Sequence, residues 1–319
     1  MAQPLLARLH EKIDGLEIDV LAPEWVAPVV RRMPEVREVI AAPFRHGALQ
    51  LGLRWRLGRS LRARAYRQAI VLPNTWKSAL VPFFADIPLR SGYVGESRYG
   101  LLNLIYKHRK AEVRDGKAER RPMVEHYAAL SEPPGKEVRS PPPLPKLRAA
   151  TSDIEAAKRK FGLEGDYAVF CPGAEYGPAK RWPYFAGLSE RVRSGGGPPV
   201  VLLGSPNDAP AARGIEGLDL VGRTTLDEAI DLIAGARYVV SNDSGLMHVA
   251  AALDRPLVAL FGSSSPRHTP PRSPHARVRW LEVECSPCYQ RECPLGHFRC
   301  MRELTVDSVA EDIQNLGWR

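Results

Sequence analysis

The chain has 319 residues, of which 44% are hydrophobic and 25% charged, and its formal net charge is +9. This length exceeds one typical hydrophobic core and favours two domains. No run approaches the roughly 18 uncharged apolar residues of a membrane span, and the first twenty residues lack the apolar block of a secretion signal. These exclusions favour a cytoplasmic protein.

The charge is divided unequally along the chain. Residues 1–150 hold 26 Lys and Arg against 15 Asp and Glu, whereas residues 151–319 hold 19 against 21. A basic first half indicates an anionic partner such as nucleic acid, an acidic lipid headgroup or a phosphorylated glycan. The alternative is that arginine serves only as a solubilising surface residue.

An amphipathic helix is predicted at 3–12, ahead of any strand. Extended apolar runs, typical of strands, follow at 17–23, 36–43 and 68–74. A nucleotide-binding half usually begins with a central strand that leads into its first helix. The first domain is therefore either built differently or lacks its first strand.

The proline-rich stretch 130–150 predicts a linker, since so much proline cannot continue a helix. Behind it, apolar runs alternate with helical patterns, which indicates a parallel sheet covered on both faces. The runs are at 166–174, 198–205, 238–243 and 257–264, and the helices at 182–194 and 225–236. The sequence therefore predicts an α/β protein with two doubly wound, Rossmann-like domains, 1–150 and 151–319, facing a cleft.

A strand-to-helix junction at 241–256 reads "SNDSGLMHVAAALDRP" and is the first candidate site. Asp243 or Ser244 can cap a helix that starts at Gly245. Gly245 would also let an anion such as a pyrophosphate approach the amides at the positive end of the helix dipole. Ser244 and His248 lie four residues apart and share one helix face. The alternatives are a simple cap and a structural histidine.

A second loop, "CPGAEYGPAKRWP" at 171–183, also follows a strand and precedes a helix. It belongs to the same rim of the second domain, because ligands of such sheets gather at the carboxyl ends of the strands. Lys180 and Arg181 are candidate phosphate partners, and Trp182 a flat apolar wall. The alternative is surface cations beside a structural tryptophan. Neither GxxxxGK[ST] nor GxGxxG occurs, which disfavours an ATPase or a dehydrogenase.

Four of the five cysteines lie in "CSPCYQRECPLGHFRC", at Cys285, Cys288, Cys293 and Cys300, with His297 among them. Such a cluster can hold a structural metal through thiolates, although the gaps do not reproduce a paired CxxC knuckle. Stable disulfides are disfavoured in the cytoplasm, so metal binding, reduced thiols and local cross-links all remain open. Cys171 is interpreted as a buried residue at a strand end.

The blocks quoted above, together with "PNTWKSALVPFFADIPLRSGYVGESRYGLLN" at 73–103 and "FGSSSPRHTPP" at 261–271, resemble the ADP-heptose:lipopolysaccharide heptosyltransferases of glycosyltransferase family 9, most closely the type II members. The resemblance covers nearly the whole chain. It implies a GT-B fold and inverting, metal-independent transfer of L-glycero-D-manno-heptose from ADP-heptose to the heptosyl-Kdo2-lipid A inner core of lipopolysaccharide. No cofactor is implied beyond the substrate.

The resemblance also implies roles for individual residues. The second domain would bind the donor, with Lys180 stabilising the diphosphate and Asp208 as a weaker candidate for the ribose. The rest of the donor pocket would be Asp243, Ser244, Gly245 and His248. The first domain would bind the anionic glycolipid acceptor through Asn74, Lys77 and Ser78, in agreement with its basic charge.

Family members begin with a strand and a glycine-aspartate loop, and that aspartate is thought to be the general base. This sequence begins after that point, which leaves the base unassigned. We expect that Met1 is an internal methionine or that the chain is trimmed. Transfer would then be slow, since a placed base contributes typically about a hundredfold to ten-thousandfold.

The remaining alternatives are a donor-binding homologue with impaired catalysis, and a heptosyltransferase with another acceptor. A nucleic-acid-binding protein is disfavoured, because the basic segment 106–122 interleaves no aromatic residues with its cations and no DNA-binding motif occurs. That segment is interpreted as a solvated loop that also touches lipid phosphate. The expected location is the cytoplasmic face of the inner membrane, with peripheral attachment.

Overall fold

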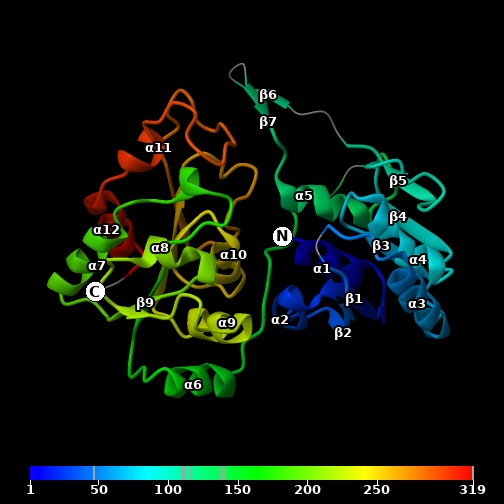
Figure 1. Cartoon of the computed structure of the whole chain (residues 1–319), viewed down its shortest axis with the longest axis horizontal. Coiled ribbons are helices and arrows are strands. Elements are labelled where there is room, and N and C mark those ends of the chain that lie inside the picture. The colour runs from blue at the N-terminus through cyan, green and yellow to red at the C-terminus, as the bar shows by residue number, and fades with distance from the viewer. Residues whose placement is uncertain (46, 109–111, 115–116, 137, 139–140, 318–319) are drawn as a thin grey trace. The chain divides into compact units, whose positions relative to one another are not determined.

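The computed structural model divides into two compact units (Figure 1). Unit 1 comprises Met1–Ala27 and Glu35–Pro143, and unit 2 comprises Pro28–Pro34 and Leu144–Arg319. The structure describes residues 1–45, 47–108, 112–114, 117–136, 138 and 141–317. The predicted division after residue 150 thus differs from the observed one within the linker and in the segment Pro28–Pro34.

Unit 2 contains one parallel sheet of six strands in the order β10-β9-β8-β11-β12-β13. Numbered along the chain, this is the order 3-2-1-4-5-6 of a doubly wound dinucleotide-binding fold. The direction of winding reverses between β8 and β11. The strands are β8 Ala168–Cys171, β9 Val200–Leu202, β10 Leu218–Asp219, β11 Tyr238–Asn242, β12 Leu257–Phe261 and β13 Ala276–Trp280.

Helices cover both faces of this sheet, and the strand residues alternate between them. Val169, Val239 and Ala259 pack on the face covered by α9 and α10, whereas Phe170 and Val240 pack on the face covered by α7 and α12 (Figure 1). The central strands are buried throughout because both faces are covered. The helices are α6 Thr151–Lys160, α7 Phe185–Ser194, α8 Ala209–Ala212, α9 Leu226–Ala234, α10 Gly245–Ala252, α11 Arg299–Arg302 and α12 Val306–Asn315.

Unit 1 contains two separate parallel sheets, β1-β2 and β3-β4-β5, and an antiparallel hairpin β6-β7. The strands are β1 Ile18–Pro23, β2 Val36–Ala42, β3 Gln68–Val71, β4 Leu89–Tyr93, β5 Leu104–Tyr106, β6 Glu112–Arg114 and β7 Lys117–Glu119. The helices are α1 Gln3–Lys12, α2 Ala27–Arg31, which continues into unit 2, α3 Leu51–Leu61, α4 Leu80–Phe84 and α5 Met123–Ala128.

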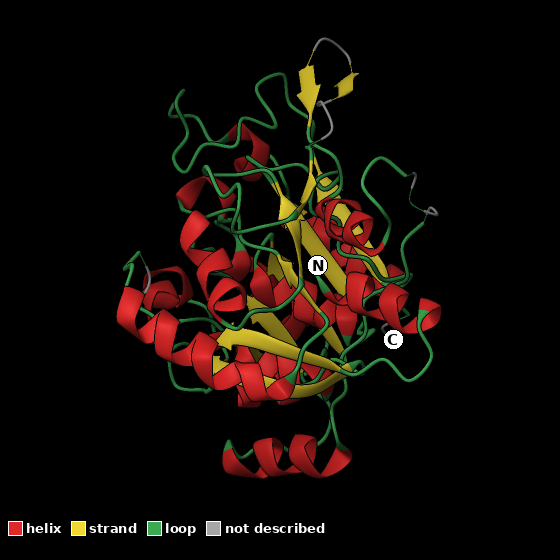
Figure 2. Ribbon diagram, turned by 90° about the vertical axis from the view of Figure 1, so that its right-hand side faces the viewer, coloured by secondary structure: helices red, strands yellow, loops and turns green. Residues whose placement is uncertain are grey.

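The two sheets of unit 1 would be the halves on either side of the first strand in a doubly wound order 3-2-1-4-5-6. Among the described residues no strand joins β1 to β3, whereas a single sheet requires one there. The hairpin replaces part of the loop predicted at 106–122, some of which lies outside the described residues. Both views show it standing out from the rest of unit 1 (Figures 1 and 2).

Short 3-10 turns complete the described secondary structure: Glu24–Val26, Arg62–Arg64, Trp76–Ala79, Ala129–Ser131, Pro178–Lys180 and Pro206–Asp208. Among the helices that the structure describes, none has both the length and the apolar character that crossing a bilayer requires.

A buried ion pair holds the segment Pro28–Pro34 in unit 2. The guanidinium of Arg32 meets both oxygens of the Asp231 carboxylate, at 2.6 and 2.9 Å. The side chains are 12% and 7% exposed, and Asp231 lies on α9. A bidentate pair of this kind is stable only while both charges are present, because either one alone would be buried without compensation.

We expect Arg32→Ala to lower the free energy of unfolding by about 3 kcal/mol or more, since it leaves the Asp231 carboxylate buried and unpaired. Arg31→Ala is the matched control: its 57% exposed side chain lies 4.0 Å from Asp227, and its loss should cost under about 1 kcal/mol. Urea unfolding measures both. Equal effects of the two substitutions would contradict the role given to Arg32.

Candidate functional site

The site is built at the carboxyl ends of β8 and β11, where the strand order of unit 2 reverses. The β8 loop, residues 172–182, follows β8 and ends in the 3-10 turn Pro178–Lys180. Asp243 and Ser244 follow β11 directly and precede α10. Because β8 and β11 are neighbouring parallel strands, both loops leave the same edge of the sheet. This reversal point is where doubly wound sheets bind ligands.

Asn242, the last residue of β11, fastens the β8 loop at both of its ends. Its buried side-chain nitrogen donates to the carbonyl oxygen of Pro172 at 2.8 Å. Its side-chain oxygen accepts from the backbone N–H of Trp182 at 3.1 Å. One amide thus satisfies a carbonyl and an N–H that would otherwise be buried without partners.

Asp243 and Lys180 lie side by side as a result. The Lys180 ammonium donates to Oδ2 of Asp243 at 2.5 Å, and the two side chains are 15% and 5% exposed. The hydroxyl of Ser264, which follows β12, donates to the same oxygen at 2.5 Å. The carboxylate therefore aims the ammonium, which retains further N–H donors for an anionic ligand.

The start of α10 is open, but it is not capped as predicted. Ser244 occupies the N-cap position without a side-chain cap bond, and its hydroxyl lies 3.2 Å from that of Ser241. The Asp243 carboxylate is occupied by Lys180 and Ser264 instead. An added Cβ at the exposed Gly245 would meet nothing within 4 Å. The first-turn amides thus face open space at the positive end of the helix dipole.

His248 lies one turn further along α10 and is half-buried. Desolvation lowers the pKa of its imidazole below the usual value. The ring is therefore neutral at neutral pH, so it can exchange hydrogen bonds with a ligand but offers no positive charge. Lys180 supplies the positive charge of the group formed with Asp243.

The structure does not bring Asp208 into this group. Its Oδ2 accepts from the backbone N–H of Ser205 at 3.0 Å, which is one half of a capping box, and also from the Ser205 hydroxyl at 2.7 Å. A Cβ added to Gly173 would lie only 2.1 Å from the carboxyl carbon of Asp208, so the carboxylate occupies the space that a side chain would need there. Asp208 therefore supports the turn beneath the β8 loop, and Arg181 approaches it at 3.8 Å.

The prediction that Trp182 forms a flat apolar wall for a ligand is wrong, and the alternative of a structural tryptophan is confirmed. The residue is 2% exposed and packs in the core with Phe185, and its indole N–H donates to the carbonyl oxygen of Leu304 at 2.9 Å. The exposed aromatic residue of the loop is Tyr176, whose ring centroid lies 5.0 Å from the Lys180 ammonium. Sequence analysis missed Tyr176 and Ser264, which share one signal: both lie in loops directly after strands.

The predicted acceptor residues lie together in unit 1, after β3. Lys77 donates to the carbonyl oxygen of Gly47 at 2.7 Å, and Ser78 donates within its own turn. The Asn74 side-chain oxygen accepts from Arg98 at 3.3 Å. Arg98 and Arg54 are 2% and 6% exposed and donate mainly to backbone carbonyls, which fixes the loops around Lys77.

The comparisons with known proteins agree with this fold. Residues 54–299 match the family described as glycosyltransferase family 9 (heptosyltransferase). The chain belongs to this family. It is 43% identical to lipopolysaccharide heptosyltransferase 2 of Salmonella typhimurium over 99% of its own length and 94% of the relative's. The corresponding values for lipooligosaccharide heptosyltransferase 2 of Haemophilus influenzae are 40%, 99% and 95%.

A solved structure supports the same assignment. The E. coli ADP-heptose lipopolysaccharide heptosyltransferase II structure matches with a TM-score of 0.83 and 40% identity, covering 99% of this chain and 93% of that one. The predictions of a glycosyltransferase and of a GT-B fold built from Rossmann-like domains are confirmed. The roles of the individual site residues stay predictions.

We expect Asn242→Ala to lower the free energy of unfolding by about 3 kcal/mol, because it leaves the Pro172 carbonyl and the Trp182 N–H buried without partners. The control is Asn207→Ala at an exposed position of unit 2, which should change stability by less than about 0.5 kcal/mol. Chemical denaturation monitors both. A loss at Asn242 no larger than at Asn207 would show that the amide does not fasten the loop.

Proposed function

We propose that this family 9 glycosyltransferase moves heptose from ADP-heptose to the heptosyl-Kdo-lipid A inner core of lipopolysaccharide. The observation that carries the donor half is the meeting of Lys180, Asp243 and the open start of α10 at one edge of the unit 2 sheet. The relatives' names supply the sugar and the lipopolysaccharide, which no contact in the site specifies.

Lys180 and the amides of Gly245 and its neighbours are proposed to hold the two phosphates of the donor. Charge develops on the diphosphate as the bond to the sugar breaks, and a lysine with N–H groups fixed beside it stabilises that charge without reorganising. Ser244 and His248 are proposed to bind the same nucleotide sugar through hydrogen bonds. Asp208 stays a weaker candidate for the ribose: its Oδ2 serves the Ser205 turn, whereas its buried Oδ1 has no hydrogen-bond partner among the described residues.

The acceptor is proposed to bind unit 1 through Asn74, Lys77 and Ser78. Support comes from the basic composition of residues 1–150 and from the exposed ammonium of Lys77. Helix α3 exposes Trp55 beside Arg56 and Arg59. A helix face that combines tryptophan with arginine suits the surface of an anionic membrane, and this supports peripheral attachment at the cytoplasmic face. The general base stays unassigned.

We expect Lys180→Ala to weaken ADP binding about tenfold and to slow heptose transfer about a hundredfold, since it removes the charge opposite the leaving diphosphate. Calorimetry with ADP and mass spectrometry of the acceptor incubated with ADP-heptose measure the two effects. Lys160→Ala, which removes an exposed lysine paired with Glu228 in the same unit, should change neither.

Unaltered ADP affinity in Lys180→Ala would refute the proposed donor site. If the unaltered chain binds ADP but adds no heptose to any defined lipid A core, the proposed transferase activity is wrong for this chain and a donor-binding protein with impaired catalysis replaces it. Transfer to a different core would overturn the proposed acceptor alone.

We expect Lys77→Ala to raise the KM for the lipid acceptor about tenfold, the loss of one charge-assisted hydrogen bond of roughly 1.5 kcal/mol, with ADP affinity unchanged. Lys136→Ala, at a 67% exposed side chain of unit 1, is the control for net charge. Steady-state kinetics with varied acceptor decides. An equal rise of KM in both variants would contradict a site at Lys77. It would indicate that the basic charge of unit 1 attracts the anionic acceptor without a specific contact.

A further inference from the structure

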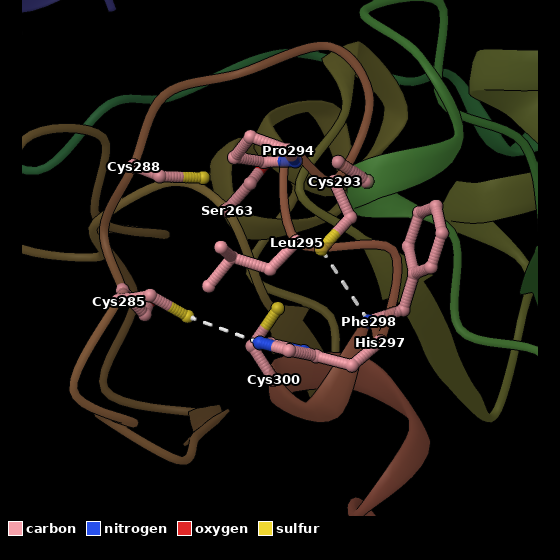
Figure 3. Close-up of a pocket in the computed structure, with 11 residues that line it drawn as sticks. Ser263, Cys285, Cys288, Cys293, Pro294, Leu295, His297, Phe298 and Cys300 are labelled. Carbon is pink, nitrogen blue, oxygen red and sulfur yellow. Dashed lines mark hydrogen bonds between the residues drawn. The ribbon is translucent and has the colours of Figure 1, made fainter.

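Four cysteines surround one small cavity in unit 2, apart from the residues given a role in transfer. They belong to the cysteine loop, residues 281–298, and to α11, which follows it. The cavity is about 20 Å³, a volume that admits one water-sized particle and excludes organic ligands. Figure 3 shows the sulfurs turned toward this space. Its lining includes Cys285, Cys288, Cys293, Cys300, His297 and Ser263.

A backbone N–H group of the loop is directed at one of the sulfurs. The backbone N–H of Phe298 donates to Sγ of Cys293 at 3.4 Å (Figure 3). Thiolates are ligands for soft ions such as zinc. The loop thus directs a backbone donor at a group that binds metal when charged.

His297 is placed as a hydrogen-bond donor to the cluster and not as a fifth ligand. Its Nδ1 accepts from the backbone N–H of Arg299 at 3.0 Å, which leaves Nε2 as the ring nitrogen that can donate. Nε2 faces Sγ of Cys285 at 3.9 Å (Figure 3). Donors of this kind orient the ligands of a metal and temper their charge. The ligand set is therefore the four sulfurs.

Ser263 adds an independent sign that the cavity takes a ligand. The residue is 1% exposed, and its hydroxyl oxygen has no hydrogen-bond partner among the described residues. A buried hydroxyl without a partner is costly and calls for an explanation. Since Ser263 lines the same cavity as the cysteines, a bound ion and its thiolates would give the hydroxyl an acceptor.

We propose that Cys285, Cys288, Cys293 and Cys300 bind one zinc ion as thiolates in a closed, structural site. The gaps of two, four and six residues bring all four sulfurs to one cavity. Within the described part of the chain, no three metal-binding side chains yet surround a single point. Binding therefore requires the side chains to turn until the sulfurs lie about 3.8 Å apart, as tetrahedral Zn–S bonds of about 2.3 Å dictate.

The zinc ion would brace the β8 loop. The carbonyl oxygen of Arg291 accepts from the backbone N–H of Ala179 at 3.1 Å, and the Tyr176 hydroxyl donates to the carbonyl oxygen of Tyr289 at 2.6 Å. Arg291 also donates to the carbonyl oxygen of Glu175 at 3.3 Å. Ala179 precedes Lys180 in the chain. A cysteine loop fixed by zinc would therefore also fix the backbone next to Lys180, through these hydrogen bonds. A metal with four protein ligands has no open position for chemistry.

The test uses the full chain, purified anaerobically with a reductant. We expect elemental analysis to find one zinc per chain, and Co²⁺ in its place to give the charge-transfer and visible absorption of a tetrahedral thiolate site. Cys288→Ala and Cys293→Ala should lose most of the metal. Cys171→Ala is the matched control, because this thiol is buried in the sheet core, where desolvation raises its pKa to about 12, and it should retain the metal.

A second measurement addresses folding. Removing zinc from the unaltered chain with a chelator should leave the circular dichroism of the sheet and helices intact while backbone amides of the cysteine loop and of 177–180 exchange hydrogen faster. Metal-free protein that takes up neither zinc nor cobalt would overturn the proposal. So would disulfides among the four cysteines in intact mass, iron in place of zinc, or equal metal loss in Cys171→Ala. None of these readouts depends on ADP binding or transfer.

Discussion

The side-chain amide of Asn242 is the contact on which the site depends. It sits at the end of β11 and bonds to backbone groups ten residues apart on the neighbouring β8 loop, at Pro172 and Trp182. The strand order brings the two loops to one edge, but it does not determine where the middle of an eleven-residue loop lies. The amide holds both ends of the loop against β11. The Lys180 ammonium therefore lies 2.5 Å from Oδ2 of Asp243, the residue that follows Asn242.

The electrostatics of the site follow from that placement. Lys180 is charged and largely buried, a costly state unless it is paired, and Asp243 supplies the opposite charge. The Ser264 hydroxyl donates to the same carboxylate oxygen and so helps to hold the Asp243 carboxylate in its orientation. Because Asp243 is committed to these partners, it does not cap α10, and the amides after Ser244 stay open. An arrangement that is incomplete as a helix cap is well suited to an anion.

Most strands of the unit 2 sheet could be predicted because the patterns that indicate them lie in consecutive residues. Continuous apolar runs predicted β8, β9, β11 and β12, and the Thr225–Glu228 pair that begins α9 forms a capping box. The two edge strands were not predicted. β10 has only two residues, and β13 alternates exposed arginines with apolar residues and lacks the continuous run of a central strand. In unit 1 the apolar runs predicted β1, β2 and β3, but β4, β5 and the hairpin were not predicted. The division of the strands into two sheets was not predicted either, because pairing is a long-range property.

The sequence by itself determined the parallel sheets and the rim that carries Lys180, Asp243 and Gly245, because strand and helix periodicity and the residues that follow each strand are written in consecutive positions. The family came from the resemblance of its motifs. The tertiary structure decided which neighbours each side chain meets. The tertiary structure buries Trp182, whose flat apolar ring could equally have lined a ligand site, because the ring packs against Phe185 and its N–H bonds to Leu304. It paired Asp243 with Lys180, 63 residues away in the chain, because a carboxylate pairs with the donors that folding brings nearest. Asp208 instead pairs locally with Ser205, three residues before it.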